Sequence, residues 1–345
     1  VESRDVLTSI KKYVYSTVEM KEGTTFDEVL DGVLSGNSVL FIDGYDTVLI
    51  ISAKGVQTRN IEEPNTEVVV RGSREGFTET LRVNTTLLRR IIKNPKLTFE
   101  SLVLGKQTHT DVCIAYIDGI ADEKIIKEVK SRLKRIDTDS ILESGYIEQF
   151  IDDNPFSPFS TIRNSERPDK VAAKLLEGRV AILCNGTPFV LTVPHLFIET
   201  LQVPEDYYAR PYLGSFLRLL RLLAFIISMT APCLYVALET FHQEMVPPVL
   251  LITAAASREG IPFPAFVETM IMIIILEMLR ESGVRLPRQV GQAVSIVGAL
   301  VIGEAAVRAG IISAPMVIIG ALTGVTTFIV PALLEPLIFS RFLLL

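Results

Sequence analysis

The sequence predicts an α/β cytoplasmic domain of two similar subdomains, followed by an α-helical transmembrane domain. Three observations lead to this prediction. Charged residues are frequent up to residue 215 and sparse beyond it. A block in the first half of the chain recurs 142 residues later. Long apolar stretches fill the last third of the sequence.

The change in charge is abrupt within a chain of 345 residues whose net charge is −6. Residues 1–215 contain 26 Lys and Arg with 32 Asp and Glu, whereas residues 216–345 contain 8 Arg, 8 Glu and no Lys or Asp. Such a loss of charge indicates a change of solvent from water to lipid. We expect an N-terminal α/β subdomain with a basic helix at 1–108, a second α/β subdomain at 109–213 and a helical membrane domain at 214–345.

The repeat supports the two-subdomain prediction. Residues 34–44 (LSGNSVLFIDG) align with residues 176–186 (LEGRVAILCNG). Each block follows an amphipathic helix, so the pattern is a helix ended by glycine, a strand, an Asp-Gly or Asn-Gly turn and a second strand. A third unit lies between them, with a strand at 112–117 and a charged amphipathic helix at 122–136.

Composition and motifs argue against several functions. The acidic net charge opposes nucleic-acid binding, because phosphate contacts need a clustered positive field. Cys113, Cys184 and Cys233 have no CxxC spacing, and the three histidines form no HxxxH pattern, so we expect no metal site. The chain has neither a GxGxxG nor a P-loop motif, and no Ser-His-Asp constellation stands out. We therefore expect no cofactor and no enzymatic activity.

Arginines gather in one short region of the first subdomain, on or near a helix expected at 76–93. We call this set the basic strip: Arg71, Arg74, Arg82, Arg89 and Arg90. One interpretation is a solvated face. The other is contact with anionic lipid headgroups or with the acidic face of a neighbouring subunit.

Apolar stretches predict the membrane crossings, since a spanning helix needs about 20 apolar residues. The expected crossings are 222–238 with its flanks, 262–279, 289–308 and 311–330. Residues 245–257 are too short to span and are expected to form a half-helix or re-entrant segment. Arg218 and Arg221 precede the first crossing, which places the N-terminal domain in the cytoplasm.

Three carboxylates lie within or beside these crossings, namely Glu268, Glu277 and Glu304. A carboxylate at membrane depth costs a few kcal/mol, so it faces protein or water. A neighbouring arginine is the simplest partner for two of them: Glu277 or Glu281 would pair with Arg280 or Arg285, and Glu304 with Arg308. Glu268 has no such neighbour in sequence, and a functional wet site is as good an interpretation as a buried pair.

One face of residues 289–308 carries small and polar side chains, and we predict that it lines a pore. The predicted pore-lining residues are Gln292, Ser295, Ile296, Ala299, Gly303 and Ala306. Packing is the alternative, because small residues spaced four apart let membrane helices approach closely. Gln292 favours water at one end of this face, since a buried amide needs several partners.

Several motifs resemble those of the A subunits of bacterial spore germination receptors, the GerA family. They are VRGSREGF at 70–77 with Asn84 and LRR at 88–90, AYIDGI at 115–120, ERPD at 166–169, GRVAIL at 178–183, EDYY at 205–208, PFP at 262–264, LRESGVRLP at 279–287 and IGEAAV at 302–307. The blocks keep their order from about residue 35 to 331. The family usually extends further at both ends, and the tail 332–345 departs from its pattern. We therefore expect a segment of a longer protein.

The resemblance implies a nutrient-responsive complex in the spore inner membrane, in which the A subunit works with a transporter-like B subunit and a lipoprotein C subunit. It also implies a homo-oligomer whose membrane helices enclose an ion pathway. A ligand-gated ion channel subunit is thus the leading hypothesis. A non-conducting membrane scaffold that anchors the nutrient-sensing partners is the alternative. A secondary transporter comes third, because the membrane part shows no internal repeat.

Overall fold

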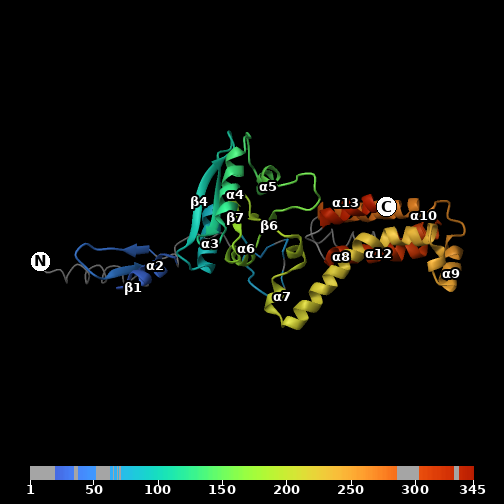
Figure 1. The fold of residues 1–345 in the computed structure, drawn as a ribbon, viewed down its shortest axis with the longest axis horizontal. Coiled ribbons are helices and arrows are strands. Elements are labelled where there is room, and N and C mark those ends of the chain that lie inside the picture. Colours follow the sequence, from blue (N-terminus) through green and yellow to red (C-terminus); the bar gives the residue numbers. More distant parts are fainter. Residues whose placement is uncertain are drawn as a thin grey trace. The chain divides into compact units, whose positions relative to one another are not determined.

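The computed structural model describes residues 20–34, 38–51, 63–64, 66–67, 69, 71–285, 303–329 and 334–345. It divides into two compact units, Val1–Leu196 and Phe197–Leu345. The first unit ends before the membrane domain that the sequence places from residue 214. Figure 1 shows an α/β first unit and an all-helical second unit, in line with the predicted fold class.

A small sheet forms the N-terminal part of the first unit. Its elements are β1 (Met20–Gly23), α2 (Phe26–Leu34), β2 (Ser38–Leu40) and β3 (Val48–Ile51). The strands are antiparallel in the order β1-β3-β2, and Lys21 and Val39 both pair with Ile50 of the central strand. The predicted order of helix, strand, Asp-Gly segment and strand is therefore present.

A five-stranded antiparallel sheet forms the larger part of the first unit. Its elements are α3 (Leu81–Ile91), β4 (Leu97–Leu104), β5 (Thr110–Ile117), α4 (Glu123–Arg135), α5 (Ser144–Ile151), β6 (Arg163–Ser165), α6 (Pro168–Leu176), β7 (Val180–Cys184) and β8 (Val190–Val193). The strand order is β4-β5-β7-β8-β6. Because β4 pairs with β5 along its whole length, the sheet runs across residue 108, where the sequence places a subdomain boundary.

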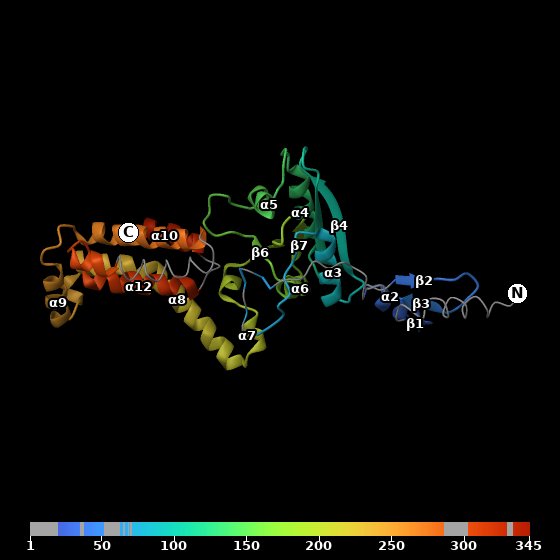
Figure 2. The ribbon, with the colours of Figure 1, turned by 180° about the vertical axis from the view of Figure 1, so that it is seen from behind.

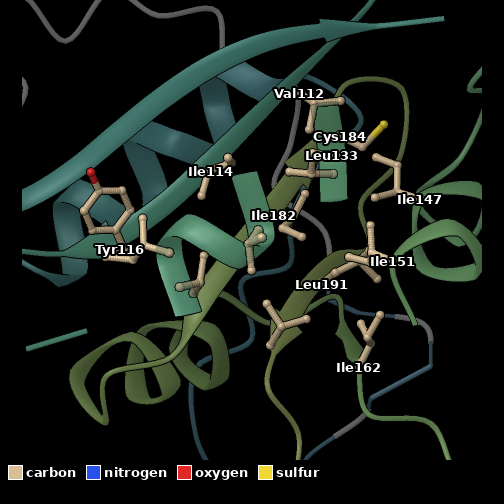
Figure 3. Close-up of a cluster of buried hydrophobic side chains, with 14 of the residues drawn as sticks. Val112, Ile114, Tyr116, Leu133, Ile147, Ile151, Ile162, Ile182, Cys184 and Leu191 are labelled. Carbon is tan, nitrogen blue, oxygen red and sulfur yellow. The ribbon is translucent and has the colours of Figure 1, made fainter. Parts of the chain in front are cut away.

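Both faces of this sheet are covered, and β5 shows how one strand serves both. Val112, Ile114 and Tyr116 contribute to the core beneath α4 and α5 (Figure 3). The alternating residues Cys113, Ala115 and Ile117 pack beneath α3 and α6. Successive side chains of a strand point to opposite faces, so a strand buried on both faces reads as a continuous apolar run.

The second repeat block is α6, β7 and β8, and its glycines adopt the backbone that only glycine takes easily. Gly178 follows the C-cap of α6 with φ +87°, and Gly186 lies between β7 and β8 with φ +95°. Gly44, the counterpart of Gly186 in the first block, has φ +82°. The Asp-Gly and Asn-Gly turns of the two blocks therefore share a left-handed glycine, whereas Gly36, the counterpart of Gly178, lies outside the described residues.

Arg167 of the ERPD motif is fully buried just before α6. Its guanidinium donates to both carboxylate oxygens of Asp169, at 2.6 and 3.1 Å, and to the carbonyl of Glu67 at 3.3 Å. The Glu67 carboxylate in turn accepts from Lys170 at 2.6 Å. Burial alone raises the pKa of Glu67, but Lys170 and Ser165 outweigh it and leave this pKa below its ordinary value. The motif thus ties the segment around residue 67 to α6.

The second unit consists of helices. They are the short 3₁₀ helices Phe197–Leu201 and Gln243–Met245, α7 (Glu205–Tyr208), α8 (Pro211–Thr240), α9 (Pro248–Arg258), α10 (Ala265–Arg285), α12 (Ala314–Ile329) and α13 (Leu334–Leu344). Figure 2 shows α12 running beside α8, and both α12 and α13 contact α8. Within the described residues, α8 is the single helix that is long and apolar enough to cross a membrane by itself. The observed helices include the short α9 that the sequence predicts.

A buried ion pair joins α7 to the start of α8. The Asp206 side chain is 1% exposed and accepts from Arg221 at 2.6 and 2.7 Å and from Arg218 at 3.1 Å. Burial by itself raises the pKa of Asp206, but the hydrogen bonds from Arg221 and Arg218 outweigh it and hold this pKa below its usual 3.8. The carboxylate therefore stabilises the folded unit in its charged form.

We predict that Gly178→Ala lowers the free energy of unfolding by about 2 kcal/mol, because an L-residue is strained at this φ. A Cβ there would also lie 2.9 Å from the carbonyl oxygen of Ile120. Gly186→Ala is the matched control, since its φ is similar but its added Cβ meets the nearest atom at 4.0 Å. Denaturant unfolding of both variants measures the difference, and equal losses would contradict the role of the close contact.

We predict that Asp206→Asn lowers stability by about 2 kcal/mol near neutral pH, because a buried charge-assisted pair is lost. A depressed pKa gives stability that is present above the unfolded value and lost as the pH falls through the folded value. The gap between wild type and variant should therefore close as the pH drops below 3.8. Thermal unfolding of the full chain in detergent at several pH values tests this. A gap that is constant with pH would refute the ion pair.

Candidate functional site

Glu268 lies in the first turn of α10 and its side chain is fully buried. Its Oε1 accepts hydrogen bonds from the backbone N–H of Ser313, at 2.6 Å, and from the Ser313 hydroxyl. Ser313 directly precedes α12, whose first N–H groups have no partner within the helix. The carboxylate therefore satisfies the positive end of α12, where negative charge is favourable.

The second carboxylate oxygen of Glu268 faces an arginine at a longer distance. Oε2 lies 3.8 Å from Nε of Arg258 and has no hydrogen-bond donor among the described residues. Arg258 also contacts the Glu239 carboxylate at 3.3 Å and donates to the carbonyl of Phe263 at 3.4 Å. The Tyr235 hydroxyl lies 3.2 Å from that of Ser313. We call Tyr235, Glu239, Arg258, Glu268 and Ser313 the Glu268 network.

The network joins four helical segments and has a specific charge balance. Tyr235 and Glu239 come from α8, Arg258 from the end of α9, and Glu268 and Ser313 from α10 and the start of α12. Two carboxylates share one guanidinium, and each of these side chains is at least three-quarters buried. Such an arrangement fixes the mutual position of the helix ends, because removing Arg258 would leave two buried carboxylates without their shared cation.

A second polar cluster involves the predicted residue Glu277. Arg341 of α13 contacts the Glu277 carboxylate at 3.2 Å and donates to the carbonyl of Ser228 at 2.8 Å. It also donates to the hydroxyls of Ser228 and Thr327, which lie 2.9 Å apart. The other Glu277 oxygen contacts Arg280 at 2.6 Å, which is one of the pairings that sequence spacing allows. We call Ser228, Glu277, Arg280, Thr327 and Arg341 the Arg341 cluster.

Of the remaining predicted site residues, some lie within the described part of the chain and others lie outside it. Glu304 pairs with Arg308 at 2.6 Å, and both side chains are exposed. Four predicted pore-lining residues, namely Gln292, Ser295, Ile296 and Ala299, lie outside the described residues. Gly303 is half-buried, and Ala306 packs against Met272, Ile312 and Met316 of the same chain.

The basic strip lies partly on α3. Arg82 and Arg89 line one surface hollow together with Phe99, Asp111 and Asn185. The Arg89 guanidinium stacks over the Phe99 ring at 4.9 Å from its centroid, and Arg90 pairs with Glu75. Arg71 and Arg74 are exposed in the segment before α3. The strip is thus a surface feature with some of its charge already paired.

Within the described part of the chain, no group of three or more His, Cys, Asp or Glu side chains is placed to hold a metal ion. Burial raises the pKa of the Cys113 and Cys184 thiols to about 11, so both are protonated at neutral pH. A protonated, buried thiol is a poor nucleophile and a poor metal ligand.

Several residues of the two polar clusters escaped the sequence analysis. Arg258 and Arg341 lie 10 and 64 residues from the glutamates they contact, which no local spacing rule connects. Ser313 did carry a signal, since a serine followed by Ala314 and Pro315 is typical of a helix N-terminus. That signal locates the helix start but not the carboxylate that caps it.

We predict that Glu268→Gln lowers the free energy of unfolding by about 2 kcal/mol, because Ser313 loses a charged acceptor and Arg258 loses one of its two buried carboxylates. Glu304→Gln is the matched control. Its exposed pair with Arg308 should contribute about 0.5 kcal/mol or less. Thermal unfolding in detergent compares the two variants, and similar losses would show that the Glu268 network does not hold the unit together.

The chain is similar to known spore germination proteins over most of its length. The family model for the Bacillus/Clostridium GerA spore germination protein matches residues 1–345. Spore germination protein KA of Bacillus subtilis is 54% identical over 313 residues, covering 91% of this chain and 58% of the relative. Spore germination protein GerLA of Bacillus cereus is 43% identical, covering 96% of this chain and 67% of the relative.

A membrane protein of Bacillus subtilis, YfkQ, is 53% identical over 308 residues, covering 89% of this chain and 60% of its own length. The chain thus spans about three-fifths of the length of the Bacillus subtilis relatives KA and YfkQ. The crystal structure of the N-terminal domain of the A subunit of the Bacillus megaterium germinant receptor GerK3 is 42% identical. It aligns with 56% of this chain and 69% of that one, at a TM-score of 0.43. The chain belongs to the GerA family of membrane-associated spore germination proteins.

Proposed function

We propose that this chain is part of the A subunit of a nutrient-responsive germination receptor, and that several copies assemble into a ligand-gated ion channel. The channel lies in the spore inner membrane, crosses it several times per subunit and keeps the α/β unit in the cytoplasm. A transporter-like B subunit and a lipoprotein C subunit complete the receptor. Family membership supports the receptor role.

The packing of the second unit is the observation that carries the channel proposal. The helices α8, α10 and α12 contact one another, and Met272 packs with Ile312 and Met316 between them. A Cβ added at Gly320 of α12 would lie 2.9 Å from the Met272 methyl group, so these two helices are in close contact. In this proposal the close packing within one copy leaves the aqueous path to an axis shared by several copies.

Residues 289–308 supply the lining in this proposal. In a cyclic assembly each copy contributes the same face, so Gln292, Ser295 and Ala299 become rings of small and polar groups around the axis. Arginines of the basic strip, Arg82 and Arg89 among them, contact the neighbouring subunit or the lipid headgroups. Within each copy, the Glu268 network and the Arg341 cluster join α8, α10, α12 and α13.

We predict that Ala299→Val changes nutrient-triggered ion release from spores by several-fold, because each copy adds two methyl groups to the same ring. Ala305→Val is the matched control, since Ala305 is exposed and lies about 120° away around a helix from Ala299. The measurement is the rate of ion release after addition of the nutrient, with receptor levels checked in both strains.

An unchanged rate in the Ala299 variant at normal receptor levels would argue against this lining. Reconstitution provides the second arm of the test. Vesicles that contain the full receptor should pass ions when nutrient is added. Vesicles that pass none in any oligomeric state would support the scaffold and exclude the channel.

A further inference from the structure

The helix α8 is longer than a bilayer requires. Its 30 residues span about 45 Å at about 1.5 Å per residue, whereas the hydrocarbon layer is about 30 Å thick. About ten residues therefore extend beyond the hydrocarbon. Arg218 and Arg221 lie in the first third of the helix, and no charged residue follows until Glu239. The surplus length is therefore at the N-terminal end, in residues 211–221.

This surplus segment exposes large apolar and aromatic side chains. Tyr212 is 69% exposed, Phe216 60% and Leu219 64%, and Tyr207 of the preceding α7 is 64% exposed. Single exposed hydrophobic residues are common on protein surfaces, but several together mark an interaction surface. We call residues 205–221 the elbow.

The elbow is internally rigid. Asp206 binds both Arg218 and Arg221, and Arg221 also donates to the carbonyl of Leu201 at 2.7 Å. Gly214 permits the close approach of α7 and α8, because a Cβ at this position would lie 2.8 Å from the carbonyl oxygen of Asp206. The exposed aromatic rings are therefore presented by a fixed scaffold.

The exposed side chains combine rings with cations. The Arg218 guanidinium stacks on the Tyr207 ring at 4.9 Å from its centroid, and Arg210 donates to the Tyr212 hydroxyl at 3.2 Å. Tyrosine suits the boundary between hydrocarbon and water, since its ring is apolar and its hydroxyl is polar. Arginine binds phosphate groups through several N–H donors. Together they match the chemistry of a phospholipid headgroup layer.

We propose that the elbow is a lipid-contact surface that lies in the headgroup layer of the membrane, with Tyr207, Tyr212 and Phe216 against phospholipid. Phospholipid is the expected partner of this surface, because the elbow runs without a break into the uncharged stretch 222–238 of the same helix. The Asp206 ion pairs lock the angle between this surface and the spanning part of α8. The proposal is independent of ion conduction, since a scaffold would need the same anchor.

The composition of the chain makes a direct test possible, because it contains no tryptophan. A single introduced tryptophan is therefore the only indole that fluoresces. The test uses three variants of the full chain in phosphatidylcholine–phosphatidylglycerol vesicles, namely Tyr212→Trp, Leu234→Trp and Phe156→Trp. Leu234 is 57% exposed within the apolar part of α8, and Phe156 is 97% exposed in the first unit. The depth of each tryptophan is measured with lipids that carry a fluorescence quencher, either a shallow one near the headgroup or a deep one near the end of the acyl chain.

We expect the tryptophan at 212 to be quenched several-fold more by the shallow quencher than by the deep one. The tryptophan at 234 should show the reverse order, and the one at 156 should respond to neither. Tyr207→Trp provides a second elbow probe that keeps a ring beneath Arg218. Its quenching should match that at 212.

Three results would overturn the proposal. If the elbow probes resist both quenchers and emit at long wavelength, the surface faces water. If they resist both quenchers and emit at short wavelength, another protein surface covers the elbow. Stronger quenching by the deep label would place the elbow inside the hydrocarbon and is equally incompatible with a headgroup location.

Discussion

The hydrogen bonds between Glu268 and the start of α12 are the constraint on which the second unit depends. A carboxylate with no exposed surface is expensive unless its charge is used, and here it is used to complete a helix N-terminus through Ser313. At the other end of α12, Arg341 donates to Thr327 in the last turn. An anion at the N-terminus and a cation near the C-terminus both match the helix dipole. The helix is thus held by charge at its two ends and by apolar packing around Gly320 between them.

Sequence reasoning succeeded where the signal was local. The helix–glycine–strand blocks were found because Gly44, Gly178 and Gly186 each have a positive φ, and such a backbone needs a particular residue type. The pairs Glu277–Arg280 and Glu304–Arg308 were found because their spacing of three or four places both residues on one helix face. These features depend on a few consecutive residues and require no knowledge of the fold.

The same reasoning failed where partners are distant in sequence. Arg341 reaches Ser228 across 113 residues, and Glu268 reaches Ser313 across 45. The sheet also contains a partner that is distant in sequence, since β5 pairs with β4 on one side and with β7 on the other. No pattern within β5 reveals that second neighbour, because a strand buried on both faces is apolar throughout. Tertiary partners of this kind follow from the three-dimensional packing of whole elements.

The use of arginine without lysine in residues 216–345 has a physical explanation in these contacts. Arg341 donates hydrogen bonds to the Ser228 carbonyl, to two hydroxyls and to the Glu277 carboxylate. Arg221 donates hydrogen bonds to both carboxylate oxygens of Asp206 and to the Leu201 carbonyl. A guanidinium has five donors in a planar fork, whereas an ammonium is a compact and strongly hydrated charge. Where water is scarce, a cation that satisfies several acceptors together stabilises the packing of three or four segments. Lysine at the same positions would leave some of those acceptors without a donor.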